Sequence, residues 1–147
     1  MQKDLILREF EDLKKAVGLL RSSTDKFIPY DAKRIYSPEE LEYYDSLSFR
    51  FEKSVEFLLN FFKGLEIYLF SKSSDTLRDQ LLVVQKLGLI DSLDFWMEAR
   101  LLRNKIAHAY LPEQLKDIYE EIIGKAGIIF QSIDKIEKFF KDKLSEE

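Results

Sequence analysis

The residue types best suited to chemistry lie close together in the stretch LLRNKIAHAYLPEQ, residues 101–114. His108 is the one histidine of the chain, and it follows Arg103 by five residues and precedes Tyr110 by two. Histidine exchanges a proton near neutrality, because its ordinary pKa is about 6.5. Arginine offers a planar, permanently charged fork that suits phosphate oxygens, and Asn104 can orient either a phosphate oxygen or the imidazole.

These side chains are the parts that metal-independent RNA cleavage needs. A base removes the proton of the ribose 2′-hydroxyl, whose oxygen attacks the adjacent phosphorus. An acid then protonates the leaving 5′-oxygen, while a cation stabilises the charge on the phosphoryl oxygens, and a 2′,3′-cyclic phosphate results. Lys105 and Arg100 lie near enough in sequence to contact flanking phosphates, although a solvated side chain is the simpler interpretation of Lys105.

Helix geometry limits how these side chains can meet. Each residue of a regular helix turns about 100°, so Asn104 and His108 share a face, whereas Arg103 and His108 lie roughly 140° apart. Pro112 predicts that the helix ends near residue 107 and that Tyr110 lies in an extended stretch. One histidine supplies only one proton-transfer group, and a two-fold homodimer would supply a second in the same cleft. The alternative is that His108 merely caps the end of the helix.

The elements that must position this stretch are predicted to be helices. Residues 4–22, 38–70, 75–87, 92–107 and 112–144 show helical periodicity or helix boundary signals. SPEE, with Ser37, Pro38 and Glu40, is a capping box with proline at the first helical position. We therefore expect an all-α, up-and-down antiparallel bundle of about five helices, two of them long. The apolar stripe of the first helix is predicted to consist of Leu5, Phe10, Leu13, Val17 and Leu20.

Composition limits the class of protein. The 147 residues, with five glycines and three prolines, favour one helical domain, residues 1–147. The absence of cysteine excludes disulfides and thiolate ligands, and we expect neither a metal nor a cofactor. Apolar runs fall short of the roughly 20 residues that span a bilayer, so we expect a cytoplasmic protein without a membrane partner. The net charge of −4 argues against a general nucleic-acid binder but allows a local basic patch.

The motif RNKIAH, from Arg103 to His108, resembles the R-x4–6-H motif of the HEPN superfamily. The longer stretch RNKIAHAY resembles the R-x4-H-x-Y signature of HepT-type toxins, which pair with minimal nucleotidyltransferase antitoxins. YYDSLSFRFEKSVEFL is similar to the second helix of related nucleotidyltransferase partners in its Arg50-Phe51-Glu52 and Glu56. Arg50 and Glu52 could reach the cleft or pair with neighbouring helices, and we favour the structural interpretation. The order and length of the helices match this family over nearly the whole chain, whereas LPEQL departs from the usual sequence after the motif.

The resemblance implies a homodimeric endoribonuclease toxin that cleaves cellular RNA without a metal. Arg103 and His108 would be catalytic and Asn104 supporting, and Tyr110 matches the position to which the cognate antitoxin attaches AMP. An AMP group beside His108 would add bulk and negative charge and so exclude RNA. The alternative is a non-enzymatic subunit that binds substrate or nucleotide in a two-component nucleotidyltransferase. The first interpretation alone predicts toxicity when the chain is expressed by itself.

Overall fold

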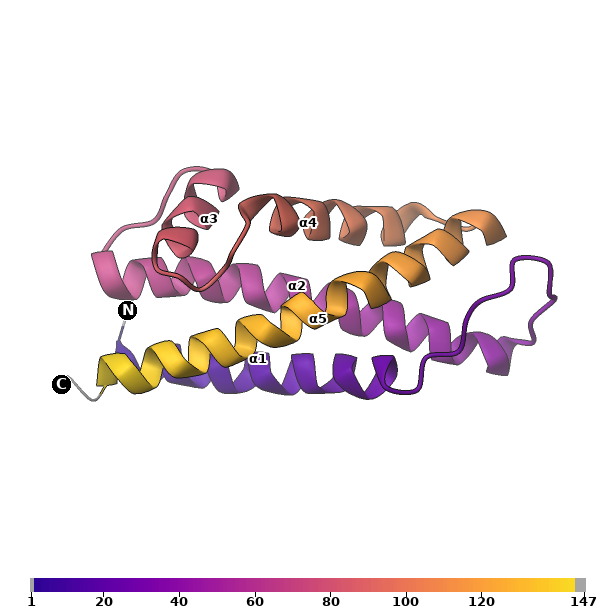
Figure 1. Cartoon of the computed structure of the whole chain (residues 1–147), viewed down its shortest axis with the longest axis horizontal. Coiled ribbons are helices and arrows are strands. Elements are labelled where there is room, and N and C mark those ends of the chain that lie inside the picture. Colours follow the sequence, from indigo (N-terminus) through magenta and orange to yellow (C-terminus); the bar gives the residue numbers. More distant parts are fainter. Residues whose placement is uncertain (1, 145–147) are drawn as a thin grey trace.

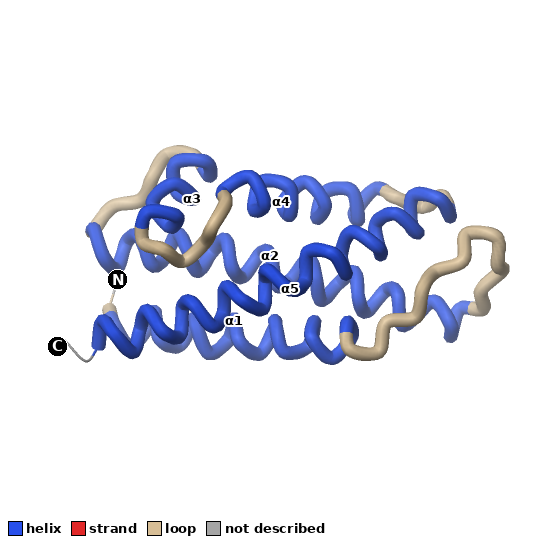
Figure 2. The backbone as a smooth tube through the Cα atoms, in the orientation of Figure 1, coloured by secondary structure: helices blue, strands red, loops and turns tan. Residues whose placement is uncertain are grey.

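The computed structural model describes residues 2–144, which form an all-α bundle of five helices (Figures 1 and 2). The predicted fold class is therefore confirmed. The 33-residue helices α2 and α5 are the two long ones, as expected, and a 22-residue helix precedes them. The helices are α1 (Lys3–Thr24), α2 (Pro38–Phe70), α3 (Leu77–Lys86), α4 (Leu93–His108) and α5 (Pro112–Leu144).

Four of the helices run lengthwise and alternate in direction, while the short α3 lies at one end (Figure 1). α2 is central and contacts each of the other four helices. α5 begins beside α4, crosses α2 and ends beside α1, with contacts to all three. Two helices of about 50 Å each can therefore cover one another, and a small bundle accommodates their length.

Local sequence signals set several helix boundaries. At the start of α2, the Glu40 amide donates to the Ser37 hydroxyl at 3.2 Å, and the Ser37 amide donates to the Glu40 carboxylate at 3.1 Å. The predicted capping box is thus present, with Pro38 at the first position. The Thr76 hydroxyl caps α3 by accepting from the Asp79 amide at 3.1 Å, and Gly88 follows that helix with φ of 81°, a conformation that glycine adopts without strain.

The connection between α4 and α5 is short and determines where the predicted site residues lie. α4 continues through His108, one residue beyond the predicted end, and Ala109 is extended with φ −82° and ψ 139°. α5 begins at Pro112, and the Gln114 side chain accepts a hydrogen bond from the Leu111 amide at 3.3 Å. Only residues 109–111 separate the two helices, so the end of α4 and the start of α5 are held together.

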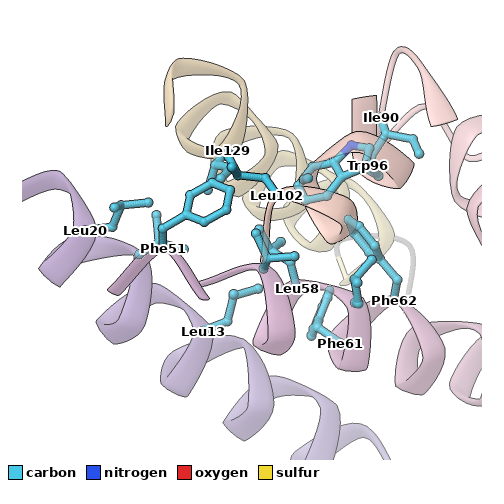
Figure 3. Packing of buried hydrophobic residues seen from close by; sticks show 14 of the residues in the cluster. Leu13, Leu20, Phe51, Leu58, Phe61, Phe62, Ile90, Trp96, Leu102 and Ile129 are labelled. Atoms are coloured by element: carbon cyan, nitrogen blue, oxygen red, sulfur yellow. The ribbon is translucent and has the colours of Figure 1, made fainter. Parts of the chain in front are cut away.

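The core is formed by apolar side chains from all five helices. Figure 3 labels members from α1, α2, α4 and α5. Trp96 of α4 is 1% exposed and meets Phe62 of α2 edge-on, with ring centroids 5.4 Å apart. The predicted stripe of α1 needs one correction, because Ile6 is fully buried while Leu5 is 43% exposed. Leu102 of α4 is also fully buried, and this fixes the rotation of α4 about its axis.

The longest connection, residues 25–37, is fastened to the bundle by tyrosines. Tyr30 stacks on Tyr36 and meets the edges of Tyr44 and Tyr119, which stack on each other with centroids 4.8 Å apart. The Tyr44 hydroxyl donates to the Ile28 carbonyl at 2.7 Å. Burial, together with the nearby Asp45 carboxylate and Tyr30, raises the pKa of Tyr119 to about 12. The cluster thus joins this connection to α2 and α5.

Candidate functional site

The predicted site residues lie on the last two turns of α4 and on the short connection after it. Arg103 is half-buried, whereas Asn104, Lys105 and His108 are exposed. Tyr110 is 78% exposed. Because α4 is anchored by its buried face, these side chains are presented in fixed directions around the helix.

Arg103 lies on the side of α4 that faces α2. Burial raises the pKa of Glu52 on α2 above its ordinary value of 4.5, and the positive charges of Arg103 and Lys53 act against that rise. Glu56 adds to the rise and pairs with Lys53 at 3.4 Å. The guanidinium therefore lies within electrostatic reach of a partly buried carboxylate from another helix.

The two α2 residues that were interpreted as structural differ in their surroundings. Arg50 donates to the Ser23 hydroxyl at 2.8 Å and to the Leu19 carbonyl at 3.3 Å, so it ties α2 to α1. Glu52 is instead coupled to Arg103. Arg50 is thus a structural residue, and Glu52 is the α2 carboxylate whose pKa, raised by burial, is lowered in part by the charge of Arg103.

His108 lines a hollow of about 400 Å³ between the end of α4 and the first turns of α5. Its other lining residues are Lys105, Ala109, Gln114, Asp117, Ile118 and Glu121. The Lys105 ammonium lies 3.9 Å from the Glu121 carboxylate across the hollow. The sequence prediction missed the α5 residues, although they follow the motif directly and their spacing places them on one helix face.

The predicted alternative, in which His108 caps the helix end, finds no support in the contacts. Within residues 2–144, no hydrogen bond or ion pair engages the side chains of Asn104, His108 or Tyr110. The last turn of α4 is closed by the backbone, where the Ala109 amide donates to the Lys105 carbonyl at 3.0 Å. The imidazole, amide and phenol are therefore available to a ligand.

One chain does not direct Arg103 and His108 at the same atom. Since α4 stays helical through His108, the two side chains remain roughly 140° apart around the axis. Arg103 is coupled to α2, while His108 lines the hollow beside α5. Tyr110 does not line that hollow. Within one chain, the two side chains are therefore not arranged to act together on one phosphate.

The outward face of α4 carries a regular stripe. Met97, Leu101, Asn104 and His108 follow one another at spacings of four, three and four residues, the spacing of a helix seam that pairs with another helix. Leu101 is 58% exposed although it is apolar. Arg100, also exposed, lies beside the stripe, about 40° around the axis from Asn104.

We found no family model that matches the chain and no similar protein among curated sequences. Among the helices of residues 2–144, none combines the length and apolar character of a membrane-spanning segment. No group of three or more histidine, aspartate or glutamate side chains within the same residues could hold a metal ion.

Proposed function

We propose that the chain is a HepT-like toxin, a metal-independent endoribonuclease that cleaves cellular RNA as a homodimer. The observation that carries this proposal is the end of α4. There an imidazole, an amide and a phenol have no partner among the described residues, and a guanidinium lies half-buried one turn away. Water satisfies exposed polar groups, so what supports a ligand site is that proton-transfer, amide and cationic side chains gather at one helix end.

The seam on α4 supports the homodimer. Leu101 offers an apolar contact to a second copy of α4, whereas Met97 is half-buried and packs partly against the core of its own chain. Asn104 at the centre of the stripe would set the register. Two-fold pairing of this face would bring the two His108 side chains near one another, and Arg103, which faces α2, would join them by extending its long side chain to the rim of the cleft. Both catalytic groups would then surround one phosphodiester, although they diverge within each chain.

In the proposed reaction, His108 accepts the proton of the ribose 2′-hydroxyl, and the 2′-oxygen attacks phosphorus. The bond from phosphorus to the 5′-oxygen breaks, and the protonated His108 of the partner subunit gives its proton to that oxygen. Arg103 stabilises the charge on the phosphoryl oxygens, and Asn104 orients the phosphate. Arg100 is placed to contact a flanking phosphate, and Lys105 could do so if it left Glu121. The products are a 2′,3′-cyclic phosphate and a 5′-hydroxyl.

Regulation through Tyr110 fits its position. The phenol is 78% exposed, two residues after His108, and an enzyme can reach its hydroxyl. We propose that a minimal nucleotidyltransferase antitoxin attaches AMP there. The added phosphate would repel the RNA backbone, and the added nucleotide would obstruct the site.

A second candidate is a non-enzymatic, nucleotide-binding subunit of a two-component nucleotidyltransferase. Two observations favour it: the carboxylates of Asp117 and Glu121 line the hollow beside His108, and the chain has a net charge of −4. Both disfavour a long RNA more than a small nucleotide. Expression of the chain alone distinguishes the two candidates, since only the nuclease should stop growth.

Cleavage of RNA in the presence of EDTA tests the nuclease directly. We expect the purified wild type to produce 2′,3′-cyclic phosphate ends, and His108→Ala and Arg103→Ala each to lower the rate by about 10²–10⁴-fold. Lys86→Ala is a suitable control, because Lys86 is an exposed basic residue in the last turn of α3. Full activity in both site variants would contradict the assignment.

Co-expression with a nucleotidyltransferase encoded beside the gene tests the regulation. We expect the intact mass of the chain to rise by multiples of an AMP unit, with the modification mapped to Tyr110. Tyr110→Phe should remain unmodified, whereas Tyr68→Phe should be modified like the wild type. Modification of Tyr110→Phe to the same extent would contradict the proposal.

A further inference from the structure

The hollow beside His108 has a mixed lining that suits a flat, uncharged ring. Ile118, 5% exposed, and Ala109 give it apolar surface. The Asp117 carboxylate has no partner among the described residues. The Gln114 carbonyl oxygen accepts from the Leu111 amide, which leaves the side-chain NH₂ group as a donor. The volume of about 400 Å³ lies in the range of small-molecule sites.

A phosphate does not suit this hollow. Asp117 and Glu121 both bring negative charge to it. The Lys105 ammonium is already within 3.9 Å of Glu121, which also lies 3.8 Å from Lys125. An anion in the hollow would therefore be repelled by the Asp117 carboxylate, which has no cation beside it within residues 2–144. A neutral group with N–H donors would instead gain a hydrogen bond to that carboxylate.

Nucleobases differ in how well they match one free carboxylate. The Watson–Crick edge of guanine places two donors, N1–H and the 2-amino group, side by side, and its O6 accepts a hydrogen bond. Adenine and cytosine pair one amino group with a neighbouring acceptor, and uracil has a single N–H between two carbonyls. The two oxygens of Asp117 match the two guanine donors, and the Gln114 NH₂ group can donate to O6.

We infer that this hollow binds a guanine base, namely the base of the nucleotide whose 2′-hydroxyl reacts. The inference rests on the proposed ribonuclease function. His108 lines the same hollow, so a base held there brings its own ribose to the imidazole. The phosphate then extends over the outer face of α4, away from the two carboxylates. Base recognition and proton transfer are thereby coupled through a single nucleotide.

The test uses DNA oligonucleotides that contain one ribonucleotide, because cleavage can then start only from that 2′-hydroxyl. Four such strands differ only in the base of the ribonucleotide. We expect the wild type to cleave the guanosine strand at least about tenfold faster than the other three, the size of discrimination that a bidentate pair gives. Asp117→Asn, which removes one acceptor and adds a donor, should abolish this preference.

Glu113→Gln is the matched control. Glu113 is an exposed acid in the same first turns of α5, but it does not line the hollow, and its replacement changes the charge equally. It should keep the guanosine preference. Equal cleavage of all four strands by the wild type, or an unchanged preference in Asp117→Asn, would overturn the inference while leaving the nuclease proposal intact.

A second experiment distinguishes failure of the guanine inference from failure of the proposed nuclease function. If the wild type cleaves none of the strands, nuclear magnetic resonance titrations with 2′-deoxyguanosine and 2′-deoxyadenosine monophosphates test whether the hollow binds guanine. Shifts of the Ala109 and Ile118 amides with the guanine nucleotide, stronger than with adenine and lost in Asp117→Asn, would support guanine binding without cleavage. Equal shifts with both nucleotides, or none, would reject it.

Discussion

Replacing Arg103 by alanine is expected to weaken the fold as well as the proposed reaction, whereas replacing His108 should affect the reaction alone. The structural difference lies in their surroundings. Arg103 is half-buried and its charge opposes the rise in the pKa of Glu52 that burial causes. His108 is exposed and its side chain has no partner among the described residues. The two variants therefore separate a folding role from a catalytic one.

The size of the effect follows from the partly exposed setting of the Arg103–Glu52 pair. Arg103 and Glu52 form no ion pair within the described residues, so their interaction contributes at most about 0.5 kcal/mol to the free energy of unfolding, after allowance for screening by solvent. Arg103→Ala should lower the free energy of unfolding by about that amount at neutral pH, with a further loss from the packing of its aliphatic stem. His108→Ala should change it by less than about 0.5 kcal/mol.

The pH dependence gives the sharper test. The folded-state pKa of Glu52 lies above 4.5, its ordinary value, so the charged carboxylate costs stability above that raised pKa. Removing Arg103 raises the pKa further and enlarges this cost. As the pH falls through the raised pKa, Glu52 becomes protonated and the cost disappears. The stability difference between wild type and Arg103→Ala should therefore shrink from neutral towards acidic pH.

Urea unfolding followed by circular dichroism, from about pH 7 to about pH 4, measures this difference. Adding Glu52→Gln to Arg103→Ala should restore most of the electrostatic loss at neutral pH. Arg100→Ala is the control, since Arg100 is exposed on the same helix and is not among the charges that act on Glu52. A loss that is equal at every pH, or one that Glu52→Gln leaves unchanged, would refute the reasoning.

Three further predictions concern the tyrosine cluster and the seam on α4. Tyr44→Phe should lower the free energy of unfolding by about 1 kcal/mol, because the Ile28 carbonyl loses its donor, and unchanged urea midpoints would contradict this. The free energy of unfolding should fall as the pH rises above about 10, because tyrosine ionises there in the unfolded chain while Tyr119 stays neutral up to about 12 in the folded protein. A free energy of unfolding that stays constant between these two pH values would contradict this prediction. Leu101→Glu should convert the proposed dimer to a folded monomer without nuclease activity, as judged by light scattering, and a dimer that persists would exclude this seam.

Much of the fold could be predicted because its signals are local. The capping box at Ser37 acts within one turn and is present in the structure as predicted, and Gly88 likewise ends α3 through its own backbone conformation. Local sequence could not show whether Leu5 or Ile6 is buried, because both are apolar. The answer depends on which side of α1 packs against the core. Pro112 limits how far α4 can extend, but it fixes the end of the helix only to within a few residues. In the structure α4 ends at His108.

The candidate site was only partly predictable, because some of its residues are brought together by helix packing and not by their spacing in the sequence. Arg103, Asn104 and His108 belong to one short stretch, so their spacing reveals them. Glu52 lies about fifty residues earlier, and only the packing of α4 on α2 brings its charge near Arg103. Asp117 was within reach of sequence reasoning, but its relevance depends on how closely α5 folds back on α4 after three connecting residues.

The direction of α5 has a practical consequence for handling the protein. The hollow lies where α5 begins, and the helix ends about 50 Å away, beside the start of α1 (Figure 1). An affinity label or a fluorescent reporter attached at the start of α1 or at the end of α5 would therefore lie at the far pole of the bundle. The protein can be tethered to a sensor surface by these ends while the turn after α4 points into free solution.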